Sequence, residues 1–164
     1  GLKAKVVYPS QRIRAVLEAV LQEYPELQSS IGVMRNEEDG LPASAVLMSS
    51  GTMSLACALS GIPGAIVYRL NPISYWLGRI LVKIPYIGIA NLLLKRPLHP
   101  EFIQGAAKPK RLAEQILTAL DDPQAGQAAA AGAAELGGLL HAGSGVSTAD
   151  WLLEACEIGS DAAK

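Results

Sequence analysis

The strongest structural signal lies at residues 45–52, which read Ala45-Val46-Leu47-Met48-Ser49-Ser50-Gly51-Thr52. The first four residues form a continuous apolar run, typical of a strand buried on both faces of a parallel sheet. The next four supply a turn, and the apolar residues that follow, as far as Leu59, predict a helix. At a helix N-terminus the unpaired amides and the dipole favour an anion, and glycine lets a phosphate approach the backbone. The segment therefore predicts a phosphate site. The alternative is an ordinary Ser/Thr helix cap, since no P-loop or G-x-G-x-x-G motif is present.

Strands and helices alternate on both sides of this segment, which predicts an α/β fold: a Rossmann-like parallel sheet flanked by helices. We expect this domain over residues 1–123. The remaining residues, 124–164, are rich in Ala and Gly at first and predict a helical tail that packs on the domain or on a partner, with partial disorder as the alternative. The predicted strands are Val6–Tyr8, Ser30–Met34, Ala45–Met48, Ala65–Tyr68 and Tyr86–Ile89. Helices are predicted from Gln11 to Tyr24 with Ser10 as N-cap, from Met53 to Leu59, from Asn71-Pro72 to about Ile84, from Pro109 to Leu120, and after Gly145.

Composition excludes several classes of protein. The 164 residues are 50% hydrophobic and 18% charged, which suits one globular domain. A net charge of -1 provides no broad basic field, so we expect no nucleic-acid partner. Cys57 and Cys156 belong to no C-x-x-C pair, so neither a zinc site nor a disulfide framework is indicated, and a reducing cytoplasmic setting fits. Charged residues interrupt the apolar region Ile62 to Leu94, and no signal peptide is visible, so we expect no membrane span. The chain opens without Met, which suggests a piece of a longer protein.

Several short motifs follow one another in an order that resembles lipid-A-disaccharide synthase. The resemblance covers the C-terminal half of that enzyme and is specific from about Leu47 to Leu120. The motifs are Ser50-Gly51-Thr52, Gly61-Ile62-Pro63, Tyr68-Arg69, Asn71-Pro72-Ile73-Ser74-Tyr75-Trp76, Asn91-Leu92-Leu93 and Pro100-Glu101-Phe102-Ile103-Gln104.

The resemblance implies a GT-B glycosyltransferase with two Rossmann-like domains and an active site between them. This chain would be the C-terminal, nucleotide-sugar-binding domain, without its first strand and glycine-rich loop. The implied donor is UDP-2,3-diacylglucosamine, the acceptor is 2,3-diacylglucosamine 1-phosphate, and UDP is released. No metal or other cofactor is implied. The catalytic base would lie in the N-terminal domain, which this sequence does not contain. The implied location is the cytoplasm, peripheral to the inner membrane of a Gram-negative bacterium.

The resemblance also implies the substrate-binding residues. Ser50, Gly51 and Thr52 would face the UDP phosphates. Arg69, after Tyr68, would neutralise charge on the leaving group, with a surface arginine as the alternative. Asn91 would contact the donor, or is simply a turn residue. Glu101 and Gln104, expected on one helical face, would line the donor side of the cleft. For Glu101 the alternative is a first-turn carboxylate favoured by the helix dipole.

One departure from the family pattern concerns Ala56. The family has a Glu at this position, where a carboxylate can accept hydrogen bonds from ribose hydroxyls. Its absence supports a second hypothesis, a diverged non-catalytic binding or assembly module of the same fold. His99 is expected to be structural or solvent-facing, with a catalytic part as the alternative.

A membrane contact and a homodimer are further expectations. In the predicted helix after Asn71, an apolar face with two basic residues suggests docking to a membrane surface, with a core helix as the alternative. The contact would be made through Ile73 and Trp76 of the apolar face and through Arg79 and Lys83, which are placed to reach phosphate head groups.

Overall fold

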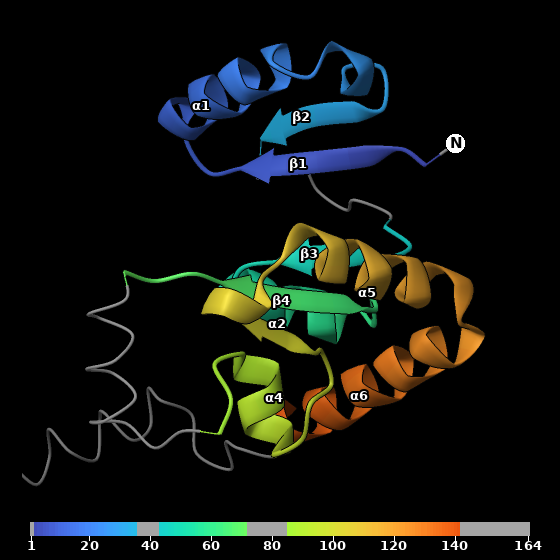
Figure 1. Cartoon of the computed structure of the whole chain (residues 1–164). Coiled ribbons are helices and arrows are strands. Elements are labelled where there is room, and N and C mark those ends of the chain that lie inside the picture. The colour runs from blue at the N-terminus through green and yellow to red at the C-terminus, as the bar shows by residue number, and fades with distance from the viewer. Residues whose placement is uncertain (1, 36–42, 72–84, 142–164) are drawn as a thin grey trace, which may run out of the picture. The chain divides into compact units, whose positions relative to one another are not determined.

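The computed structural model describes residues 2–35, 43–71 and 85–141, and these fold as two compact units, Gly1–Pro42 and Ala43–Lys164 (Figure 1). Both units combine parallel strands with flanking helices, so the predicted Rossmann-like α/β architecture is confirmed. The expected boundary between 123 and 124 does not coincide with these units and stays a prediction. Residues 72–84 of the helix predicted from Asn71-Pro72, and the helix predicted after Gly145, lie outside the described residues.

The first unit is one strand-helix-strand crossover. Its two strands are parallel, with Ala4 opposite Ile31 and Tyr8 opposite Arg35. Ser10 stands at the predicted N-cap of the helix, but its side chain makes no capping hydrogen bond, and its carbonyl oxygen accepts the first amides instead. The elements are β1 (Ala4–Tyr8), α1 (Gln11–Gln22), the 3-10 turn η1 (Pro25–Leu27) and β2 (Ile31–Arg35).

The second unit holds a parallel sheet in the order β3-β4-β5. Helix α2 forms the crossover between β3 and β4, as the sequence at 45–68 predicts. The long helix α6 contains the Ala-rich stretch that was expected to form a helical tail. The elements are β3 (Val46–Met48), α2 (Thr52–Leu59), β4 (Gly64–Tyr68), α4 (Ile89–Leu94), β5 (Glu101–Ile103), the 3-10 turn η2 (Gln104–Ala106), α5 (Pro109–Asp121) and α6 (Pro123–His141).

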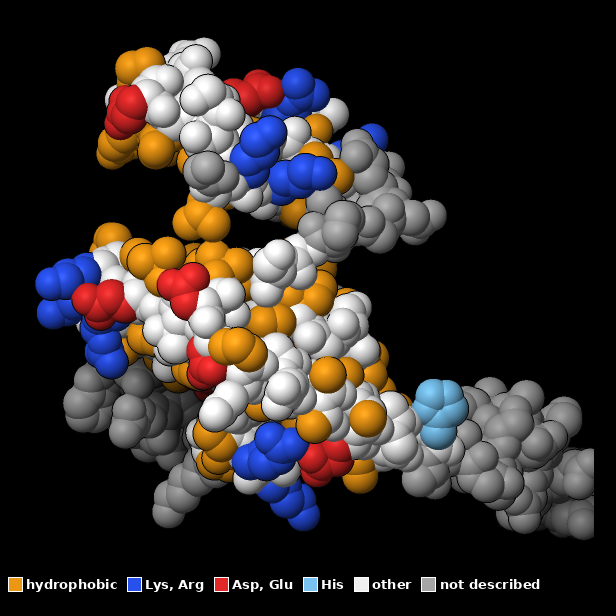
Figure 2. All heavy atoms as spheres, turned by 90° about the vertical axis from the view of Figure 1, so that its right-hand side faces the viewer, with side chains coloured by type: hydrophobic (Ala, Val, Ile, Leu, Met, Phe, Trp, Pro, Cys, Tyr) orange, Lys and Arg blue, Asp and Glu red, His pale blue; other side chains and the backbone are white. Residues whose placement is uncertain are grey.

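Two hydrophobic clusters hold this second unit together. Helix α5 packs on β3 and β4, and Leu112 of α5 contacts a cluster that contains Ala65 and Phe102 of the sheet. Helices α2, α4 and α6 pack on one another through a second cluster that includes Ala58 and Leu136. Helix α6 is therefore part of the folded unit. On the face drawn in Figure 2, charged side chains form small groups among exposed hydrophobic side chains.

The predicted strand Tyr86–Ile89 is wrong. Residues 85–88 form turns, and Ile89 begins α4. The amides of Ile87 and Gly88 donate to the carboxylate of Glu101, so they are not available for a sheet. The third strand of the sheet is β5, where Glu101 pairs with Ile66 of β4. The expected placement of Glu101 and Gln104 on one helical face is therefore also wrong.

Candidate phosphate-binding edge of the sheet

Three segments that the sequence singles out meet at one edge of the β3-β4-β5 sheet. Because the strands are parallel, their carboxyl ends lie on the same side. Ser49–Thr52 follows β3, Arg69 follows β4 and Gln104 follows β5. This edge of an open α/β sheet is where such folds bind ligands.

The turn after β3 depends on glycine. Gly51 has φ 123° and ψ -161°, a backbone conformation that L side chains rarely adopt. It sets the chain for α2, which begins at Thr52 without a side-chain cap. Ser50 is half-buried and Thr52 is exposed. The arrangement leaves the positive end of α2 without a carboxylate in its first turn, which is favourable for an anion.

Ser54 supports this turn and was not predicted as a site residue. Its side chain is fully buried, and its hydroxyl donates to the carbonyl oxygen of Gly51 at 2.6 Å. The amide of Ser54 donates to the same oxygen at 3.1 Å. The amide of Leu55 also donates to this oxygen, at 3.4 Å, so three donors fix the carbonyl of Gly51. The signal in the sequence is a serine three residues after a glycine at the start of a helix.

Arg69 supplies a positive charge at this edge. Its side chain is exposed and makes no hydrogen bond or ion pair within the described residues 2–35, 43–71 and 85–141. Tyr68, the last residue of β4, is half-buried. A guanidinium that pairs with no carboxylate of the described residues can form charge-assisted hydrogen bonds to a phosphate.

Gln104 contacts the backbone of the segment that carries Arg69. Its amide oxygen accepts the N–H of Leu70 at 2.9 Å, and its amide nitrogen donates to the carbonyl oxygen of Leu70 at 2.9 Å. Gln104 itself has φ 51°, an uncommon conformation for a residue with a side chain. The structure thus brings Gln104 to the predicted edge, where it is bonded to the chain.

Asn91 lies inside the fold. It is fully buried, and its side chain makes four hydrogen bonds, two as donor and two as acceptor. The amide nitrogen donates to the carbonyl of His99 at 2.7 Å and to Glu101 at 2.9 Å. The oxygen accepts the amides of Leu98 at 2.8 Å and His99 at 3.0 Å. An Asn side chain has no further donor to offer a ligand, so this geometry gives Asn91 a structural task.

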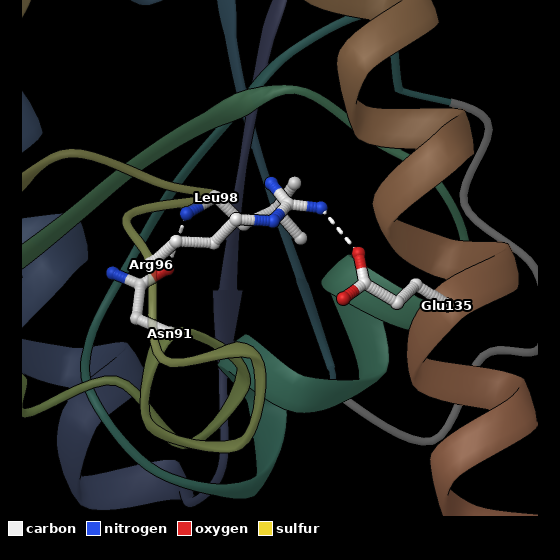
Figure 3. A network of polar contacts seen from close by, with 4 residues as sticks. All are labelled: Asn91, Arg96, Leu98 and Glu135. Carbon is white, nitrogen blue, oxygen red and sulfur yellow. Dashed lines mark hydrogen bonds and ion pairs between the residues drawn. The ribbon is translucent and has the colours of Figure 1, made fainter.

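The same network includes Glu101 and an ion pair at the surface. Glu101 accepts the amides of Ile87 and Gly88, each at 2.9 Å, and so caps α4 from the neighbouring strand. Glu101 itself lies in β5 and in no helix, so the alternative of a first-turn carboxylate is wrong. Figure 3 shows Arg96, in the loop that Asn91 organises, extending to Glu135 on α6 at 2.6 Å. Both side chains are about half exposed, so this pair contributes less than about 1 kcal/mol.

His99 is a buried structural residue, and the alternative of a solvent-facing histidine is wrong. Its exposure is 1%, and its Nε2 lies 2.9 Å from the carbonyl oxygen of Ile62. A carbonyl oxygen can only accept a hydrogen bond, so Nε2 of His99 carries the proton. In the neutral ring Nδ1 is then an acceptor. Nδ1 is buried without a partner among the described residues. Burial lowers the pKa of His99 below its usual value.

The membrane-facing hypothesis concerns residues outside the described ranges. Ile73, Trp76, Arg79 and Lys83 all fall between 72 and 84. Among the helices that the structure does describe, none combines the length and apolar character that crossing a membrane requires. Within the same residues, no group of three or more His, Cys, Asp or Glu side chains could hold a metal ion.

Parallel strands, crossover helices and a glycine turn at the carboxyl edge define the second unit as a Rossmann-like α/β domain. Comparison with known proteins identifies the family: the model for "Lipid-A-disaccharide synthetase" matches residues 1–138. The chain belongs to this family, whose members are glycosyltransferases.

Curated relatives agree with the family assignment. The lipid-A-disaccharide synthase of Gluconobacter oxydans is 32% identical over 113 residues, which is 68% of this chain and 27% of that protein. The enzyme of Nitrosococcus oceani is 39% identical over 80 residues, which is 49% of this chain and 21% of that protein. The enzyme of Aquifex aeolicus is 50% identical over 62 residues, covering 38% and 17% of the two chains. The chain thus spans less than a third of the length of these relatives.

Proposed function

We propose that this chain binds the nucleotide-sugar donor in a glycosyltransferase that makes the lipid A disaccharide. The donor is UDP-2,3-diacylglucosamine and the acceptor is 2,3-diacylglucosamine 1-phosphate. The observation that carries the proposal is the meeting of the Ser50-Gly51-Thr52 turn and Arg69 at the carboxyl edge of one parallel sheet.

The edge would act on the leaving group. In the transfer, an acceptor hydroxyl oxygen bonds to the anomeric carbon of the donor, and the bond between that carbon and UDP breaks. Negative charge then develops on the diphosphate. The amides at the start of α2 and the guanidinium of Arg69 stabilise that charge. We assign the base that takes the hydroxyl proton to the N-terminal domain implied by the family resemblance, so the chain alone is expected to bind UDP without catalysing transfer.

Calorimetric titration with UDP and with pyrophosphate tests this proposal. The wild type should bind both ligands, with the amide resonance of Gly51 shifting in each case. Arg69→Gln should weaken both by about tenfold or more, because hydrogen bonds to charged groups contribute about 1.5–3 kcal/mol. Arg12→Gln, an exposed change on α1, is the control and should leave both affinities unchanged. Absence of binding to the wild type would contradict the proposal.

A second candidate function is a non-catalytic binding or assembly module, and the observation in its favour is Ala56. This residue is exposed on α2, one turn after Thr52, and offers a methyl group where the family pattern has a carboxylate. Such a module would keep the fold and lose affinity for the ribose.

We also propose that residues 72–84 contact a membrane surface, because the acceptor and donor carry acyl chains. The cytoplasmic face of the inner membrane would be the place of action. The double variant Arg79→Glu with Lys83→Glu should reduce flotation with anionic liposomes. Equal flotation of wild type and variant, or no flotation of either, would contradict this contact. A homodimer is part of the same proposal and would appear as a doubled mass in light scattering.

A further inference from the structure

The side chain of Gln104 extends the pairing between β4 and β5 beyond the end of the sheet. The last paired residues are Tyr68 and Ile103. One step further, the Gln104 amide both accepts from and donates to the backbone of Leu70. A primary amide has the donor and acceptor of a peptide group, so it takes the place of a strand neighbour that the backbone no longer supplies.

This pairing bears on Arg69 through the alternation of side chains along a strand. Ala65 and Val67 belong to the cluster that packs under α5. Arg69 follows at the same spacing, just after β4 ends at Tyr68, so an extended backbone through Leu70 would place it on the α5 face. A shift of one residue would move Arg69 to the opposite face. Leu70 is 38% exposed, so packing alone holds it weakly.

A strained backbone accompanies the contact. Gln104 holds φ 51°, and η2 begins at this residue. A residue with a Cβ rarely adopts a positive φ, because the Cβ then approaches the following carbonyl oxygen. In this conformation the side chain makes both bonds to the backbone of Leu70.

We propose that Gln104 is a positioning residue that keeps Arg69 on the α5 face of the sheet edge, where it binds the donor diphosphate. The proposal rests on the proposed function and changes the expected task of Gln104. The resemblance implies a residue that lines the donor side of the cleft, whereas the contacts describe one that acts through Leu70.

The test is a double-mutant cycle in the full 164-residue chain. Gln104→Gly removes the side chain and also suits the positive φ, so this variant is expected to fold. It should weaken UDP and pyrophosphate about as much as Arg69→Gln, roughly tenfold. In the Arg69→Gln background, Gln104→Gly should add almost nothing, because the two residues act as one unit. Full additivity of the two effects would overturn the proposal.

Lys95→Gly is the matched control. Lys95 has φ 54°, is exposed and follows α4, so this change also relieves a positive φ and removes a long side chain. Both ligands should keep their affinity in it. Hydrogen exchange at the amide of Leu70 separates the two proposals: it should be faster in Gln104→Gly and unchanged in Lys95→Gly. If the wild type bound no UDP, the proposed function would fall, whereas unchanged exchange in Gln104→Gly would overturn the positioning role itself.

Discussion

At the scale of single residues, position 56 decides between the two candidate functions. Ala56→Glu places a carboxylate on the exposed face of α2, where ribose hydroxyls can donate to it. Such hydrogen bonds contribute about 1.5–3 kcal/mol, so UDP should bind roughly tenfold to a hundredfold more tightly. Pyrophosphate has no ribose and should be unaffected. Calorimetry with both ligands measures the difference.

The control for this substitution is Ala128→Glu, which adds the same side chain on an exposed position of α6. It should change neither affinity. If Ala56→Glu folds and leaves UDP affinity at the wild-type value, the ribose does not lie against α2, and the assembly module becomes the better interpretation.

His99 makes the stability of the fold depend on pH. Its pKa is lowered by burial, so between its folded pKa and its unfolded value near 6.5 the unfolded chain binds more protons. The contribution of neutral His99 to the stability of the fold is therefore complete above about pH 6.5. It is lost as the pH falls towards the pKa of His99 in the folded protein. Thermal unfolding between pH 7.5 and 5.5 should show a falling Tm. His99→Gln should reduce that fall, although the variant starts from a lower Tm.

His141, exposed at the end of α6, provides the comparison for His99. His141→Gln should keep the wild-type dependence of Tm on pH. Equal slopes in the wild type and His99→Gln would show that another group controls the acid response.

At the scale of elements, the pairing of β3 with β4 requires a glycine. A Cβ at Gly64 would overlap the carbonyl oxygen of Val46, a backbone atom that cannot move without disturbing the ladder. Gly64→Ala should therefore lower the free energy of unfolding by about 1–3 kcal/mol or more. Gly138 lies on α6 with open space around it, so Gly138→Ala should raise it by about 0.5–1 kcal/mol.

Urea unfolding of the two alanine variants gives both values. The same chemical change then has opposite signs in a strand and in a helix. A neutral Gly64→Ala would mean that β3 and β4 separate at that point in solution.

Local patterns in the sequence predicted most of these elements but not the contacts between distant ones. The apolar run 45–48 and the spacing in α1 and α5 are periodic signals, and the structure has elements there. The run Tyr86–Ile89 is also largely apolar, yet the amides of Ile87 and Gly88 bind Glu101, 14 and 13 residues further on. The segment 101–103 is three residues long and begins with the charged Glu101, so its sequence does not predict a strand. For the site, the turn at Gly51 follows from a local motif and Arg69 from the family resemblance, whereas the bond of Gln104 to Leu70 joins residues 34 apart.

At the scale of the whole molecule, the two units differ in how many hydrophobic side chains they bury. In the first unit, α1 has no buried residue, and Tyr8 is the buried hydrophobic residue among those described. The second unit has two clusters of buried residues. We expect amides of β1 and β2 to exchange hydrogen faster than those of β4, because local opening costs less where little apolar surface is buried.

Hydrogen exchange followed by mass spectrometry measures this difference between peptides from the two units. The peptides that cover α6 serve as the internal standard, since Leu136 is completely buried. Uniform protection of all strands would contradict the prediction and would mean that the chain opens as one cooperative unit.

The turn at Gly51 finally has a consequence for handedness. A Cβ built there in the ordinary L configuration meets no atom within 4 Å, so size does not exclude it. What excludes an L residue is the backbone, since φ 123° and ψ -161° mirror the extended conformation of ordinary strands. Enlarging the surroundings by mutation therefore cannot make alanine acceptable at this position. A D-amino acid prefers these same angles, so position 51 selects its residue by chirality rather than by volume.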